Sequence, residues 1–188
     1  MQLSKPSCIQ QATTLLSKLQ GSLVWSIRCS EFGVLSLNFG KPHLSIHGPY
    51  RSNPSSSAKV KAALGRRLVK PTGDWQLFVE DADWEAVGGP HKASRTSKAS
   101  ERDQVLDQLD GQRLLNIRFD QQTAQWIFTF DLGGILVIGS PKLDEAEVGT
   151  EQDESLWTLF FWDAGNATWT LDGRLVFESR RDKPQVVA

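Results

Sequence analysis

The sequence predicts an α+β fold in which two related halves, each a helix followed by four or five strands, form a mainly antiparallel sheet or a closed barrel with two packed helices. Two observations predict it. One helix-to-strand segment occurs twice along the chain, and in each copy the spacing of apolar residues changes from helical to alternating after a glycine. The composition, 39% hydrophobic and 23% charged over 188 residues, is typical of a chain that folds around its own core.

The two copies of the segment are LLSKLQGSLVWSIR, residues 15–28, and VLDQLDGQRLLNIR, residues 105–118. A constant shift of 90 residues aligns Leu16 with Leu106 and Gly21 with Gly111. Apolar residues at i, i+1 and i+4 before the glycine indicate one face of a helix, and the glycine ends that helix because it accepts a positive φ without penalty. The alternating apolar residues that follow indicate a half-buried strand.

Three further alignments extend the repeat: LSLNFG (35–40) with FTFDLG (128–133), LSIHGP (44–49) with LVIGSP (136–141), and DWQLFVED (74–81) with LWTLFFWD (156–163). The last alignment pairs Trp75 with Trp157. One strand later, Trp84 and Trp169 form a second pair. Repeated positions are more simply explained by packing than by two copies of a site, so we expect these four tryptophans in the core.

Two tryptophans, Trp126 and Trp162, have no aromatic counterpart in the other half. They are therefore the expected positions of any exposed aromatic contact.

The periodicity predicts helices over residues 6–19 and 99–109. Strands are expected at 22–29, 33–39, 43–47, 74–80 and 83–87 in the first half, and at 112–119, 124–131, 134–139, 155–162, 167–171 and 174–178 in the second. The remaining segments, 49–73, 88–100 and 142–154, are rich in Ser, Pro, Gly or charge and are expected to be exposed loops. The predicted division is 1–98 for the first half with its basic loop, 99–178 for the second half, and 179–188 for a flexible tail.

The common catalytic and cofactor motifs GxGxxG, GxxxxGK[ST], HExxH, GxSxG and paired CxxC are absent from the sequence. We therefore expect no enzyme activity, no catalytic residue, no cofactor and no metal. The two cysteines, Cys8 and Cys29, do not follow a disulfide pattern and are expected as reduced thiols.

Two residue groups bear on this expectation. His43 and His47 share one face of a predicted strand, and Cys29 could join them as a third metal ligand, but two surface histidines are the simpler interpretation. Acid–base chemistry needs paired carboxylates, and the nearest set lies around Asp81, in FVEDADWEA. We interpret that set as a polar hairpin, and a small-ligand or hydrolytic β-barrel that uses it is an alternative hypothesis.

The net charge of −1 conceals an asymmetry between the two parts of the chain. Residues 1–100 hold 13 Lys or Arg and 6 Asp or Glu, whereas residues 101–188 hold 8 and 16. The two strongest charge clusters are the expected partner-binding residues: Lys59, Lys61, Arg66 and Arg67 in the basic loop, and Asp144, Glu145, Glu147, Glu151, Asp153 and Glu154 in the acidic loop. A weak nucleic-acid interaction through Lys59 to Lys70 is a second alternative, although the chain is not basic overall and lacks interleaved aromatic residues there.

The order of motifs resembles a bacterial family with a duplicated helix-plus-strands unit and a G-[DE]-W-x-L motif. The matching residues are Phe39-Gly40, Gly73-Asp74-Trp75-Gln76-Leu77, Trp84 and Leu109-Asp110-Gly111-Gln112-Arg113-Leu114. The resemblance spans residues 12–178, its motifs are structural, and it implies no activity; the insertion 49–70 and the acidic loop are longer than the pattern expects. More loosely, the chain is similar to immunity proteins of interbacterial toxin systems.

These observations together favour a non-enzymatic protein-binding domain, of which an immunity-type protein that blocks a toxin is one form. The expected partner is another protein, while a membrane is not expected and nucleic acid is the weaker alternative. The amino terminus lacks a secretory signal and no segment has the length of apolar sequence that spans a bilayer, so a cytoplasmic location is expected.

Overall fold

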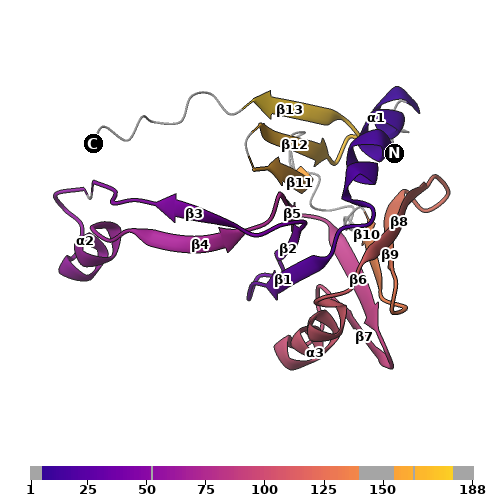
Figure 1. Ribbon diagram of the computed structural model, residues 1–188, viewed down its shortest axis with the longest axis horizontal. Helices are drawn as coiled ribbons and strands as arrows, with labels where there is room; N and C mark the ends of the chain where they lie inside the picture. The colour runs from indigo at the N-terminus through magenta and orange to yellow at the C-terminus, as the bar shows by residue number, and fades with distance from the viewer. Residues whose placement is uncertain (1–5, 52, 140–154, 163, 180–188) are drawn as a thin grey trace, which may run out of the picture.

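The computed structural model describes residues 6–51, 53–139, 155–162 and 164–179 and has the predicted α+β architecture (Figure 1). The helices are α1 (Pro6–Leu16), continued by the short 3-10 turn η1 (Ser17–Leu19), α2 (Ala58–Leu64) and α3 (Ala99–Leu109). The strands, all paired antiparallel, are β1 (Val24–Cys29), β2 (Leu35–Phe39), β3 (His43–His47), β4 (Leu68–Thr72), β5 (Trp75–Val79), β6 (Asp83–Gly88), β7 (His91–Ser94), β8 (Leu114–Asp120), β9 (Gln125–Phe130), β10 (Ile135–Gly139), β11 (Ser155–Phe161), β12 (Gly165–Thr170) and β13 (Leu175–Ser179).

The described strands form three open sheets. None of these is the closed barrel that the sequence allowed as an alternative. A six-stranded sheet has the order β1-β2-β5-β11-β12-β13, and a five-stranded sheet has the order β7-β6-β10-β9-β8. The inward side chains of both sheets belong to one buried cluster, so the two sheets form a sandwich. The third sheet is the two-stranded ribbon β3-β4, which projects from this body.

Helices close the two open sides of the sandwich. Helix α3 packs on β1 at one edge of the six-stranded sheet and on β6 and β7 at the facing edge of the other sheet. Helix α1 packs on β8 and β13, at the opposite edges. Their leucines Leu16, Leu19, Leu106 and Leu109 are at most 3% exposed, as the helical spacing predicted. Each helix therefore seals an edge that would otherwise admit water between the sheets.

The repeat in the sequence corresponds to an approximate two-fold relation in the structure. Gly21 N–H donates to the carbonyl of Leu114 at 2.8 Å, and Gly111 N–H donates to the carbonyl of Val24 at 2.8 Å. These two bonds are exchanged by the same shift of 90 residues that aligns the sequences. Both glycines have positive φ, +81° and +84°, as helix-ending glycines require.

Each half contributes strands to both sheets. The first half supplies β1, β2 and β5 to the six-stranded sheet and β6 and β7 to the five-stranded sheet. The second half supplies β8, β9 and β10 to the five-stranded sheet and β11, β12 and β13 to the six-stranded sheet. The alignment of 35–40 with 128–133 matched β2 with its true counterpart β9, although two residues out of register. The other two later alignments matched strands that are not equivalent. The counterpart of β10 is β5, not β3, and β5 and β11 are direct neighbours rather than equivalents.

The tryptophans illustrate this correction. Trp84 pairs with Ile138 and Trp157 pairs with Val79 at corresponding places in the two sheets, so Trp84 is the counterpart of Trp157. Trp75 is only half-buried and packs edge-on against Phe161 at 5.0 Å. Trp126, expected as a candidate for exposure, is 2% exposed and contacts Trp157 and Trp169 between the sheets. Core packing explains most of the tryptophans, although not through the predicted pairs.

Two expected loops contain regular structure. Residues 88–100 include strand β7, and residues 49–73 include helix α2 and strand β4. The sequence does not indicate strand β4 because the strand contains Pro71; proline is tolerated there because each strand of a two-stranded ribbon has a free edge. Among the residues that the structure describes, no helix combines the length and the apolar composition needed to cross a bilayer. Cys8 and Cys29 are free thiols, as expected.

Candidate functional site

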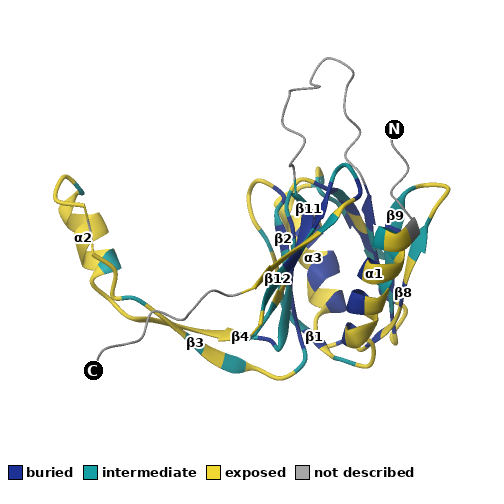
Figure 2. Cartoon of the chain, turned by 90° about the horizontal axis from the view of Figure 1, so that it is seen from above, coloured by how far each residue is buried: buried dark blue, intermediate teal, exposed yellow. Residues whose placement is uncertain are grey.

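The ribbon β3-β4 and the α2 turn at its tip, residues 41–73, form a projection that we call the arm (Figure 2). From 41 to 72, none of the described residues is buried. Figure 2 shows the contrast between the exposed arm and the buried interior of the sandwich. An arm of this kind makes few contacts with its own body, so its side chains are available to another molecule.

The arm has one apolar face. Leu44 pairs with Pro71 and Ile46 pairs with Val69, and directly paired residues of an antiparallel ribbon share a face. Leu44 and Ile46 are 69% and 66% exposed, which is unusual for large aliphatic side chains next to each other. The opposite face carries Ser45, His47 and Lys70 and is polar apart from Leu68.

The arm is strongly cationic. Its sequence contains seven Lys or Arg residues and no Asp or Glu: Lys41, Arg51, Lys59, Lys61, Arg66, Arg67 and Lys70. In the described part of the structure, none of these seven forms a salt bridge. Like charges on a slender projection create a positive potential that attracts an anionic surface.

At its root, the arm is fixed by Asp74. One carboxylate oxygen accepts a hydrogen bond from Lys41 N–H at 2.7 Å, and the other lies 2.5 Å from Nε2 of His43. The ring of His43 stacks on Trp162, with centroids 4.7 Å apart and an interplanar angle of 15°. The hydrogen bond to His43, followed by the one from Lys41, holds the pKa of Asp74 below its usual value against a smaller opposing effect of burial. The arm is therefore attached through a defined joint rather than a loose linker.

The neighbouring residues of the G-D-W motif have structural tasks at the same joint. Gly73 N–H donates to the side-chain oxygen of Asn38 at 3.0 Å. A Cβ on Gly73 would lie 2.5 Å from the carbonyl oxygen of Phe39, so no other residue fits. Trp75 then starts β5 and packs on Phe161. The motif that carried the family resemblance is thus explained by the attachment of the arm.

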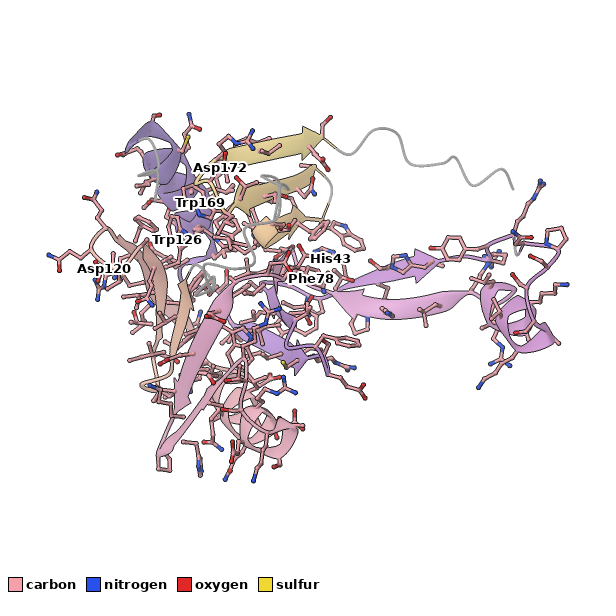
Figure 3. All side chains as sticks on the ribbon, turned by 180° about the vertical axis from the view of Figure 1, so that it is seen from behind. His43, Phe78, Asp120, Trp126, Trp169 and Asp172 are labelled. Atoms are coloured by element: carbon pink, nitrogen blue, oxygen red, sulfur yellow. The ribbon has the colours of Figure 1, made fainter. Side chains whose placement is uncertain are left out.

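A cavity of about 380 Å³ lies in the angle between the polar face of the arm and the outer face of the six-stranded sheet. It is lined by Ser45, His47, Thr72, Gly73, Gln76, Phe160, Phe161, Trp162, Gly165, Asn166, Glu178 and Ser179. Figure 3 shows His43 and Phe78 close to where the arm leaves the body. The sequence had singled out Trp162 as a possible exposed aromatic, and the structure places it at this cavity.

The basic partner-binding residues that the sequence predicted lie together near the tip of the arm. Lys59 and Lys61 are on α2, and Arg66 and Arg67 lie between α2 and β4. All four are exposed. The acidic set Asp144, Glu145, Glu147, Glu151, Asp153 and Glu154 lies outside the described residues.

The histidine and cysteine group considered as a metal site is not brought together. His43 and His47 do share a face of β3, but His43 is engaged by Asp74, and Cys29 is on β1 of the sandwich. Burial raises the pKa of the Cys29 thiol. Within the described ranges, no three His, Cys, Asp or Glu side chains are close enough to hold a metal ion.

The carboxylates near Asp81 are divided among separate roles. Glu80 accepts hydrogen bonds from Ser155 and Thr158, and Glu85 forms an exposed salt bridge with Lys92 at 2.7 Å. Asp83 and Glu85 line a second cavity of about 340 Å³ together with Arg95, but Asp81 does not. Trp84, which also lines it, is 1% exposed and donates through its indole N–H to the carbonyl of Gly33. The large apolar side chains in its lining are Trp84 and Val137, whereas three aromatic side chains, Phe160, Phe161 and Trp162, line the cavity at the root of the arm.

Comparisons of the chain with protein-family models, with curated proteins and with solved structures found no match.

Proposed function

We propose that this protein is a non-enzymatic binding protein whose arm engages an acidic surface of a partner protein. The observation that supports this most directly is an exposed projection whose sequence has seven cations and no anion, and whose cations form no salt bridge with any described residue. Electrostatic complementarity of this kind accelerates association and selects the partner. The root at Asp74 presents the arm in one direction, which reduces the ordering that binding requires.

The apolar face of the arm favours a protein over nucleic acid. Leu44, Ile46 and Val69 are more than half exposed on a ribbon against which no other described strand or helix forms a layer. A two-stranded ribbon gains little stability alone, and a partner that covers this face would remove apolar area from water. Phosphates would neutralise the cations but leave the apolar face uncovered.

Nucleic-acid binding is the second candidate, because a cationic two-stranded ribbon has dimensions that fit the major groove. It predicts affinity that falls steeply with salt and requires no apolar contact. The finer proposal, an immunity-type protein in the cytoplasm that blocks a toxin, is compatible with the arm if the covered surface of the toxin is acidic.

The test uses tagged protein purified with its partner from native cells. It compares two variants, each of which replaces four cationic residues by glutamate. Lys59→Glu, Lys61→Glu, Arg66→Glu and Arg67→Glu together reverse four arm charges; a variant with Lys18→Glu, Arg28→Glu, Arg113→Glu and Arg118→Glu reverses four exposed body charges. Loss of one stoichiometric, acidic partner only with the arm variant would support the proposal. Retention of that partner by the arm variant, or tighter binding of a labelled DNA or RNA duplex than of any protein, would refute it.

A further inference from the structure

One side of the cavity at the root of the arm is a row of side chains on the six-stranded sheet, and the proposed binding of a partner by the arm does not involve this row. Gln76, Phe160, Asn166 and Glu178 are consecutive cross-strand partners on β5, β11, β12 and β13, so they form one row on the outer face of the sheet. The row alternates amide, aromatic ring, amide and carboxylate. Phe160 is 42% exposed, so part of its ring is open to a ligand.

The wall of the cavity is an aromatic side chain in a fixed position. Trp162 lines the cavity and is stacked on His43, which Asp74 holds in turn. The backbone N–H of Trp162 also donates to the carbonyl of Asp74 at 3.0 Å. The hydrogen bond of its backbone and the stacking of its ring fix the position of Trp162. A ligand that packs on the indole therefore pays little entropic cost for ordering this side chain.

The polar groups of the cavity are suited to an uncharged ligand with many hydroxyl groups. Within the described part of the chain, the side-chain amides of Gln76 and Asn166 make no hydrogen bond, and each offers both donors and an acceptor. The hydroxyls of Ser45 and Thr72 lie on the arm side of the cavity. Among the described residues that line the cavity, Glu178 is the one carboxylate, His47 is the one titratable nitrogen group, and there is neither Lys nor Arg, which favours a neutral ligand over phosphates and other anions.

We infer that this cavity binds a neutral saccharide of one or two rings. The C–H face of a sugar ring packs on aromatic side chains, while its hydroxyl groups pair with amides and a carboxylate. The volume of about 380 Å³ lies in the lower part of the range of small-ligand sites, roughly 300–1,000 Å³. The site is separate from the tip of the arm, so this inference does not depend on the proposed function.

The test uses saturation-transfer NMR and calorimetry on the full chain with a panel of common neutral mono- and disaccharides, among them glucose, galactose, mannose, N-acetylglucosamine, maltose, cellobiose and lactose. At least one sugar is expected to bind, and both Phe160→Ala and Asn166→Ala are expected to weaken that binding by about tenfold or more. The matched control is Phe32→Ala, which removes an aromatic ring that is 84% exposed in the β1–β2 loop and should leave the affinity unchanged.

Three results would overturn the inference: no sugar of the panel binds the wild-type chain, the control weakens binding as much as the cavity variants do, or adenosine binds more tightly than every sugar. Circular dichroism of each variant establishes that it is folded. Reversal of the four tip charges should not change sugar affinity, so loss of partner binding and loss of sugar binding are distinguishable.

Discussion

The body and the arm of this molecule use apolar residues in opposite ways. In the body, inward side chains such as Trp157 and Leu37 are at most 1% exposed between two sheets and two helices. In the arm, Leu44 and Ile46 occupy alternating strand positions of the same kind but are about two-thirds exposed. The same sequence pattern therefore builds a core in one region and a surface in the other, and the difference is whether the fold supplies a second layer.

The sharpest test of this contrast is a pair of truncations. Trp157→Ala should lower the free energy of unfolding by about 3–5 kcal/mol, because it removes a fully buried ring from the centre of the sandwich. Ile46→Ala on the arm should change it by less than about 0.5 kcal/mol, the usual range for surface substitutions. Urea titrations followed by circular dichroism measure both. A loss of similar size from the two variants would mean that the arm packs against the body.

Removing the arm should leave the body folded. In the other half, Phe130 and Gly134 are joined by the tight turn Asp131–Gly133, whereas the corresponding Phe39 and Trp75 are joined through the arm. Replacing residues 40–74 by Asp-Leu-Gly should therefore reproduce the turn and change the free energy of unfolding by less than about 2 kcal/mol, since it removes almost no buried side chain. A denaturation curve that loses its cooperativity would contradict the division into body and arm.

The two-fold relation of the body can be tested with its paired glycines. A Cβ on Gly21 or on Gly111 would meet no atom within 4 Å, so alanine there costs only the strain of a positive φ. Gly21→Ala and Gly111→Ala should each reduce the free energy of unfolding by about 1–2 kcal/mol, and by similar amounts. A large difference between them in guanidinium titrations would show that the two helix ends are not energetically equivalent.

A small, pH-dependent effect is expected at the joint between body and arm. The pKa of Asp74 is lower in the folded state than in the unfolded chain. The stabilisation that ionised Asp74 provides is therefore fully present at a pH above the unfolded-state pKa, and it is lost as the pH falls through the folded-state pKa. At neutral pH, Asp74→Asn should cost less than about 1 kcal/mol because both partners are partly exposed. Unfolding measured from pH 6 to pH 2 should show a shallower acid loss in the variant than in the wild type.

The sequence predicted the elements of the body well because their signals are local. Apolar spacing and the paired glycines located α1 and α3, and alternation located most strands. Strand partners are not local, so the alignment of residues 44–49 with 136–141 selected two similar apolar runs that the chain uses differently: β3 in the arm and β10 in a sheet.

The arm and the cavity were harder to predict. Serine, proline and lysine from 49 to 73 suggested a loop, although Ser57 caps α2 by accepting from Val60 N–H at 3.3 Å. The cationic residues near the tip could be identified from composition alone. The row of Gln76, Phe160, Asn166 and Glu178 could not, because it unites four strands whose register only the fold determines.

The exchange of strands between the halves also bears on how such a chain could arise. A polypeptide carrying one unit alone would present β6-like and β11-like strands with no sheet of its own to join, and would need a second copy to complete both layers. Tandem fusion turns that concentration-dependent pairing into an intramolecular step. In a covalently linked pair the two corresponding connections can differ in length: here the one after β2 is the arm and the one after β9 is a short turn.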